Sequence, residues 1–204
     1  MIKPHKTLED VSKEEFLGHF SHSATATYLD ILLKMSSVRW KLEKLLLAQR
    51  GFAVDLAVGY VTRAHNELNL TVLDSDIPLF RELFTRAHFN VPAPQNTDPD
   101  LHFIAQTLIT DTGTNIHINV AGINISGEEV SDNETPGGEK YTFPIKVSEL
   151  IWERRIGDVP IQFYSPFLVY AFKKVQQNLG IKRGIEDPDF KILEKAFPQL
   201  NGLS

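Results

Sequence analysis

The chain has 204 residues, with 21 Lys and Arg against 26 Asp and Glu, which gives a formal net charge of −5. A charge of this sign disfavours nonspecific binding to nucleic acid or to anionic lipid, so we expect neither as a partner. The sequence contains no cysteine, so any metal must be held by His, Asp, Glu or amide oxygens.

Length and composition also predict a single cytoplasmic domain. A hydrophobic fraction of 42% is sufficient for one packed core over residues 1–204. Within it we expect an N-terminal helical region, 1–43, and a sheet core with C-terminal helices, 44–204. No apolar run approaches the roughly 20 residues that span a bilayer, and the first ten residues are too polar for a secretory signal. We therefore expect no contact with a membrane.

The N-terminal half is predicted to contain helices followed by strands. Ser12 and Glu15 form a capping-box pattern at the start of one helix, and apolar residues at helical spacing predict a second helix over residues 24–35. Residues 44–50 favour a short buried strand, although their leucine run would also suit the end of a helix. From residue 67 to residue 73 polar and apolar residues alternate, which predicts a strand with one polar face.

The next elements are a helix and a hairpin. Ser75 or Asp76 is predicted to cap a helix that reaches about residue 87. Residues 101–110 and 115–122 favour strands and flank a turn signal, which predicts an antiparallel hairpin. The acid-rich segment 127–140 is predicted to be a solvated loop.

The C-terminal part is predicted to alternate short strands with helices. Strands are expected at residues 141–143 and 159–163. Helices are expected from Ser165, which precedes a proline, to residue 180 and from residue 188 to residue 197. Helices and strands therefore occur together throughout the chain, and the expected fold class is α+β.

A glycine and two polar strand faces suggest a site for phosphate and metal. Gly51 would let the backbone at the start of the following helix approach a phosphate, which the free amides of a helix N-terminus bind. Glu67 and Asn69 share one face of the expected strand, and His117 and Asn119 share a face of the hairpin's second strand. A divalent ion that bridges a nucleotide needs carboxylates at such a place.

From residue 50 to residue 73 the sequence resembles the aminoglycoside and lincosamide adenylyltransferases, which have the nucleotidyltransferase fold. The family pattern is a glycine pair, an aromatic residue, Ala-x-Asp with Leu and Gly after it, Thr-Arg-x-His and then an Asp-x-Asp pair on the next strand. The residues that fall on this pattern without a gap are Gly51, Phe52, Ala53, Asp55, Gly59, Thr62, Arg63 and His65. The resemblance continues more loosely to about residue 191. It implies a nucleotidyltransferase-like mixed β-sheet flanked by helices, with an N-terminal helical extension.

The resemblance also implies roles for individual residues. Those that it implies for nucleotide binding are Gly51, Phe52, Arg63 and His65. Those that it implies for metal binding and catalysis are Glu67, Asn69 and His117. The chain departs from the family at several of these places. Arg50 stands where the family has its first glycine, and only Glu67 of the three expected carboxylates is retained.

By resemblance, the implied reaction transfers a nucleoside monophosphate from an NTP, with Mg²⁺, to a hydroxyl of a small-molecule acceptor. Since Asn69 is a neutral ligand and His117 prefers softer metals than magnesium, this activity is expected to be weakened or lost. One alternative is an inactive protein that still binds a nucleotide or another ligand. Another is a metal site of His65, Glu67 and His117, a set suited to zinc, iron or manganese. The sequence does not predict the oligomeric state.

Overall fold

The computed structural model describes residues 3–91, 103–107, 116–126, 129–132, 142–143, 147–178 and 188–202. The predicted turn at residues 111–113 lies outside these ranges. The described residues also form three 3₁₀ segments. Gly18–Phe20 follows the first helix, Asp74–Asp76 directly precedes the helix that begins at Ile77, and Pro198–Gly202 follows the last helix.

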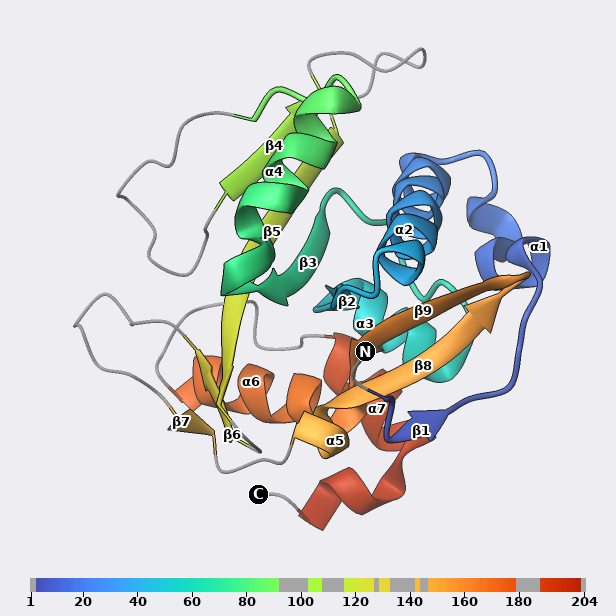
Figure 1. The fold of residues 1–204 in the computed structure, drawn as a ribbon. Coiled ribbons are helices and arrows are strands. Elements are labelled where there is room, and N and C mark those ends of the chain that lie inside the picture. Colours follow the sequence, from blue (N-terminus) through green and yellow to red (C-terminus); the bar gives the residue numbers. More distant parts are fainter. Residues whose placement is uncertain are drawn as a thin grey trace.

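The described strands form one mixed nine-stranded sheet in the order β1-β8-β9-β2-β3-β5-β6-β7, with β4 paired to β5 (Figure 1). The strands are β1 (Lys6–Thr7), β2 (Leu47–Ala48), β3 (Leu68–Leu73), β4 (Phe103–Thr107), β5 (Ile116–Ser126), β6 (Glu129–Asp132), β7 (Thr142–Phe143), β8 (Ile151–Ile156) and β9 (Val159–Tyr164). In the middle of the sheet β2 runs parallel to β9, and β3 runs parallel to β5. The pair β2 and β3 is antiparallel.

Helices cover the sheet on both faces. They are α1 (Lys13–Leu17), α2 (Ala24–Lys41), α3 (Gly51–Val58), α4 (Ile77–Arg86), α5 (Val147–Leu150), α6 (Pro166–Asn178) and α7 (Pro188–Ala196). Figure 1 shows α4 beside β4 and β5, and α2 beside β9. Helices α3, α6 and α7 pack against one another.

Two neighbouring residues of β8 show that α2 and α3 lie on opposite faces of the sheet. Glu153 lies 3.8 Å from Arg39 of α2, whereas Arg154 donates hydrogen bonds to the carbonyl oxygens of Leu56 and Ala57 in α3. Adjacent side chains of a strand point to opposite faces. The sheet is therefore enclosed between α2 and α3 near β8 and β9, and both residues of β2 are buried in the core.

Arg39 links α2 to the hairpin of β8 and β9. Its side chain is fully buried and donates to the Gln162 side chain at 3.0 Å and to the Pro160 carbonyl at 3.3 Å. Burial lowers the pKa of Arg39, and the nearby Glu153 carboxylate opposes that shift. A buried charge of this kind must be paired, so these contacts fix the N-terminal helical region on the sheet.

Several sequence predictions are confirmed. Ser12 and Glu15 form a capping box at the start of α1, and β4 pairs with β5 as an antiparallel hairpin. Ser165 caps α6 through the Leu168 backbone N–H. Helix α4 begins after Asp76 as expected, but the Asp76 side chain makes no cap and instead accepts a hydrogen bond from Lys44 at 2.8 Å.

Two predictions need correction. Within the acidic segment 127–140, predicted as a loop, residues Glu129–Asp132 form strand β6 because they pair with the long strand β5. Strands β1 and β8 were also not predicted. β1 has only two polar residues, and β8 carries charged residues between apolar ones; β1 is stabilised by pairing with β8, and β8 also by pairing with β9.

None of the helices in the described ranges is both long and apolar enough to span a membrane.

Candidate functional site

A polar strip lies where β3 and β5 run side by side, and it consists of Glu67, Asn69 and Asn119. The parallel register places Asn69 of β3 beside Asn119 of β5. The Asn69 amide donates to Glu67 Oε1 at 2.9 Å, and the Asn119 amide donates to Glu67 Oε2 and to Asn69 Oδ1, both at 3.0 Å. Each oxygen of the Glu67 carboxylate therefore accepts an amide hydrogen bond from within the polar strip.

Arg50 faces the same carboxylate. Its guanidinium nitrogen Nη1 lies 3.7 Å from Glu67 Oε1. Arg50 immediately precedes α3 and has a φ of 56°, in the left-handed region that disfavours residues with a Cβ atom. The backbone at this position has the conformation that suits glycine, but the residue there supplies a positive charge to the polar strip.

The polar strip does not offer the ligands that magnesium prefers. Mg²⁺ is bound through hard oxygen ligands, chiefly carboxylates, and the strip has a single carboxylate whose oxygens already accept hydrogen bonds. Throughout the described ranges, no group of three or more His, Asp or Glu side chains is placed to hold a metal ion. The side chains present therefore do not fit a divalent metal in this arrangement.

Gly51, the first residue of α3, is closely surrounded by side chains. A Cβ atom added at Gly51 would lie 2.7 Å from Arg63 Nη2 and 2.6 Å from His65 Cε1. Phe52, the next residue, stacks on the His65 ring with 4.3 Å between ring centroids. Of the four residues predicted to bind nucleotide, Gly51, Arg63 and His65 therefore meet at the start of α3, and Phe52 supports the histidine from the core.

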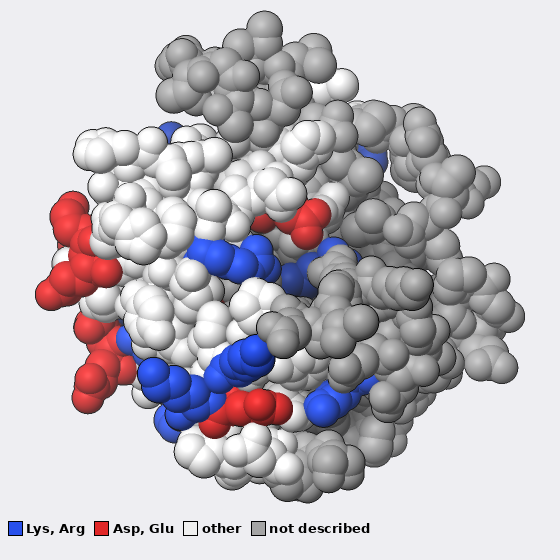
Figure 2. All heavy atoms as spheres, turned by 180° about the vertical axis from the view of Figure 1, so that it is seen from behind, with Lys and Arg blue, Asp and Glu red and all other residues white. Residues whose placement is uncertain are grey.

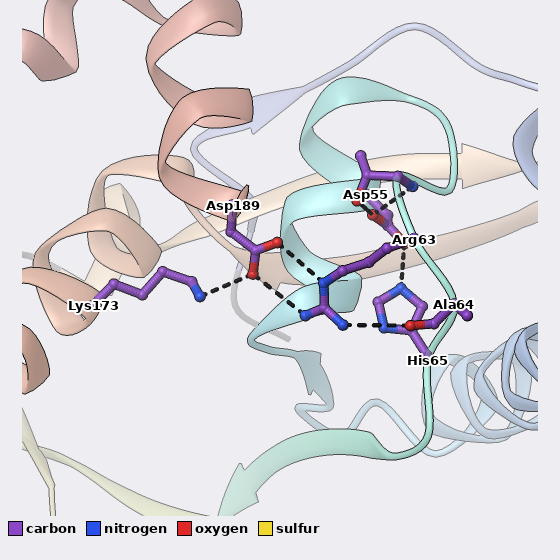
Figure 3. Close-up of polar contacts among 7 residues, drawn as sticks. Asp55, Arg63, Ala64, His65, Lys173 and Asp189 are labelled. Carbon is purple, nitrogen blue, oxygen red and sulfur yellow. Dashed lines mark hydrogen bonds and ion pairs between the residues drawn. The ribbon is translucent and has the colours of Figure 1, made fainter. Parts of the chain in front are cut away.

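Asp55 of α3 holds the segment that leads to β3 (Figure 3). Its carboxylate accepts hydrogen bonds from the Thr62 backbone N–H at 3.0 Å and the Thr62 hydroxyl at 2.6 Å. On the other side, His65 Nε2 lies 2.5 Å from Asp55 Oδ2. The His65 backbone N–H also donates to the Thr25 hydroxyl of α2 at 2.9 Å. This buried network positions Arg63, which lies between the two residues that Asp55 contacts.

A second carboxylate, Asp189 of α7, binds two cations of the site (Figure 3). Arg63 Nε lies 3.2 Å from Asp189 Oδ1, and Lys173 Nζ of α6 lies 2.9 Å from Oδ2. The Asp189 side chain is only 1% exposed. Burial acts to raise the pKa of Asp189, but the hydrogen bonds and charges of Arg63 and Lys173 outweigh it and hold the pKa below its usual value.

This shift predicts a dependence of stability on pH. A carboxyl whose pKa is lowered by folding stabilises the native state above its unfolded pKa of 3.8, and that contribution is lost as the pH falls through the folded pKa. The urea midpoint of the wild-type protein should therefore fall more steeply than that of an Asp189→Asn variant as the pH falls below about 4. Parallel pH profiles would show that Asp189 does not contribute.

Local positive charge is present despite the negative net charge. Figure 2 shows lysine and arginine side chains close together in the middle of the face seen from behind, with acidic side chains beside them. Around the start of α3, the named cations Arg50, Arg63 and Lys173 contact two carboxylates, Glu67 and Asp189.

The structure places the predicted residue His117 outside these contacts of the polar strip. Its side chain is exposed, and its backbone N–H donates to the Tyr28 hydroxyl at 3.2 Å. The same hydroxyl donates to the Asn66 carbonyl at 2.6 Å, which ties α2 to the start of β3. His65 lies against Asp55, and the described residues give no support for a metal group of His65, Glu67 and His117.

Comparison with solved structures identifies the fold. The lincosamide antibiotic adenylyltransferase LnuA, crystallised with lincomycin, has a TM-score of 0.60 at 14% identity, covering 81% of this chain and 95% of LnuA. ANT(2")-Ia, in complex with adenylyl-2"-tobramycin, has a TM-score of 0.58 at 15% identity, covering 88% of this chain and 94% of that protein. A nucleotidyltransferase-like protein from Paracoccidioides brasiliensis has a TM-score of 0.51 at 13% identity, with 84% and 76% covered.

The chain has a nucleotidyltransferase-like fold. The sequence itself matches no family model and no curated protein. The α+β class and the mixed sheet flanked by helices, both expected from the sequence, are confirmed.

Within this nucleotidyltransferase-like fold, three features of the site were not assigned from sequence. The sequence placed Asn119 on the polar face of its strand. Its contact with Asn69 could not be assigned, because that contact depends on the register between two strands whose residues lie 50 positions apart. Asp55 fell on the family pattern without an assigned role, and the structure shows it fully buried. Lys173 had no assigned role, because its partner Asp189 belongs to a different helix.

Proposed function

We propose that this protein binds a nucleoside triphosphate between the start of α3 and the polar strip. Transfer of the nucleoside monophosphate to a small-molecule hydroxyl is weak or absent in this proposal. The observation that carries it is the hydrogen-bonded polar strip, in which Glu67 is the one carboxylate and both of its oxygens are occupied by Asn69 and Asn119. Such a strip supplies little of the electrostatic stabilisation that phosphoryl transfer needs.

The cations around Gly51 support binding of the phosphates. Arg63 lies at the Gly51 backbone, and Lys173 lies on the far side of Asp189. Guanidinium groups bind phosphate oxygens through two parallel N–H donors. The start of α3 carries a partial positive charge that favours an anion. These groups together suit a chain of phosphates better than a neutral ligand.

The solved structures with this fold support the choice of nucleotide and acceptor classes. One of them is named as a lincosamide antibiotic adenylyltransferase and is bound to lincomycin, and another is in complex with adenylyl-2"-tobramycin. We accordingly propose a small hydroxylated molecule as the acceptor, if transfer occurs, and Mg²⁺ as the metal to test. The cytoplasm, where nucleoside triphosphates are abundant, is the location that we propose.

Thermal unfolding in the presence of ATP, GTP, CTP and UTP tests this proposal. A nucleotide at about a hundred times its Kd adds about 2.7 kcal/mol to stability, which raises the Tm of a chain of this size by roughly 5–10 °C. We expect such a rise with at least one nucleotide. Arg63→Gln should weaken binding by about tenfold, since it removes a charged donor.

Arg155→Gln is the matched control for Arg63→Gln. Both arginine side chains are 41% exposed, but Arg155 lies near Asp10 and donates to the Asp158 carbonyl. It should bind nucleotide like the wild-type protein. Absence of any Tm rise with all four nucleotides, with or without Mg²⁺, would refute the proposal.

A further inference from the structure

We propose that the Arg50 guanidinium takes the place of a divalent cation in this site, so that the preferred ligand is the metal-free polyphosphate of a nucleoside triphosphate. This inference rests on the proposed function and specifies the charge state of its ligand. It starts from the disagreement between the fold, whose resemblance implies a metal, and the side chains of the polar strip, which do not fit one.

The first step concerns the Glu67 carboxylate. A divalent ion binds a carboxylate through oxygen lone pairs, and the amides of Asn69 and Asn119 already donate to both Glu67 oxygens. A metal would therefore have to share both oxygens of the one carboxylate with amide donors. The positive charge that Glu67 faces comes instead from Arg50, with Nη1 at 3.7 Å from Oε1.

The second step concerns how Arg50 reaches this position. Arg50 has a φ of 56° and directly precedes Gly51, whose backbone is approached by Arg63. Arg50 directly precedes α3 and faces Glu67, and the Arg63 guanidinium lies against Gly51, so both arginines border the start of α3. Positive charge is unfavourable at the N-terminus of a helix unless an anion is present. The arrangement is thus suited to an anion that contacts Arg50, Arg63 and the Gly51 backbone together.

The third step concerns the charge of the ligand. A nucleoside triphosphate carries its magnesium ion on phosphate oxygens, and that ion competes with protein cations for the same oxygens. A site that already holds arginines would gain little from a second cation and would repel it. A guanidinium group can itself bind a pair of phosphate oxygens through two N–H donors. The site should therefore prefer the nucleotide without its metal.

The test compares ATP binding in EDTA with ATP binding in excess Mg²⁺ by isothermal titration calorimetry. We expect the wild-type protein to bind ATP more tightly in EDTA than in excess Mg²⁺. Inorganic tripolyphosphate in EDTA is a further arm. We expect tripolyphosphate to bind at least tenfold more weakly than ATP. Equal affinity for the two ligands would mean that the site recognises phosphates alone, and would overturn a nucleotide as its ligand.

Arg50→Gly removes the guanidinium without straining the backbone, because glycine adopts a positive φ readily. It should retain the fold and lose about tenfold or more of the ATP affinity measured in EDTA. Glu43→Gly is the matched control. Glu43 has a φ of 55°, close to that of Arg50, and its side chain is exposed. Glu43 precedes β2, whereas Arg50 follows β2 and leads into α3. This control should bind ATP as the wild-type protein does.

Two outcomes overturn the inference while leaving the proposed function in place. One is ATP binding that is as tight in Mg²⁺ as in EDTA, or tighter. The other is an Arg50→Gly variant that binds ATP in EDTA with unchanged affinity. If ATP and the other nucleoside triphosphates fail to bind in both EDTA and Mg²⁺, the proposed function itself fails, and the inference fails with it.

Discussion

Replacement of Asp55 by alanine is expected to lower the free energy of unfolding by about 3 kcal/mol. The Asp55 carboxylate is fully buried and accepts hydrogen bonds from both the backbone and the hydroxyl of Thr62. It also contacts the buried His65 ring. Alanine would leave these donors without the acceptor that they share, and a buried donor without a partner is costly. Urea unfolding of the wild type and the variant measures the difference.

Asp30→Ala is the control for this prediction. Asp30 also forms an ion pair, with Lys13, but its side chain is 47% exposed. Exposed ion pairs contribute at most about 1 kcal/mol. A loss for Asp55→Ala no larger than that for Asp30→Ala would show that the buried network does not hold α3 to the segment leading into β3.

The double variant Asn69→Asp with Asn119→Asp is expected to bind Mg²⁺ more tightly than the wild-type protein does. The two substitutions place carboxylates on either side of Glu67, because Asn69 and Asn119 both contact it. Without metal, three adjacent carboxylates repel one another and lower the Tm. With millimolar Mg²⁺ or Mn²⁺ the variant should be restabilised, with a metal affinity roughly tenfold or more above that of the wild type.

The pair Asn69→Asp with His117→Asp separates the two candidate positions on β5. His117 was the expected third residue from the sequence, whereas Asn119 contacts both Glu67 and Asn69. The Asn119 pair should therefore show the larger Mg²⁺-dependent rise in Tm, together with release of pyrophosphate from a nucleoside triphosphate. A wild-type response to Mg²⁺ equal to that of the Asn119 pair would contradict the view that the polar strip excludes metal.

Local patterns in the sequence were sufficient for most of the fold. The capping box of Ser12 and Glu15 and the proline after Ser165 each specify a helix start through residues a few positions apart. Strand β8 could not be predicted in this way. Arg154 and Arg155 interrupt its apolar pattern. The position of Arg154 is explained by its hydrogen bonds to carbonyl oxygens at the end of α3, a contact between segments far apart in the sequence.

The site depended on longer-range contacts. The motif from Gly51 to Asn69 indicated which residues gather at the start of α3, because they lie within 19 positions of one another. The sequence did not reveal that Asp189, 126 positions from Arg63, pairs with that arginine. It also did not reveal that Arg50 would face Glu67, since a side chain's direction after a positive φ is set by the surrounding packing.

The most direct test of the nucleotide site is a titration of ¹⁵N-labelled protein with ATP, once in EDTA and once in Mg²⁺, followed by NMR. Shifts are predicted at the backbone amides of Gly51 and Arg63 and at the side-chain amides of Asn69 and Asn119. These side-chain amides now donate within the polar strip. Saturable shifts centred on these four residues would support the account. Shifts centred elsewhere, or none at millimolar ATP, would contradict it.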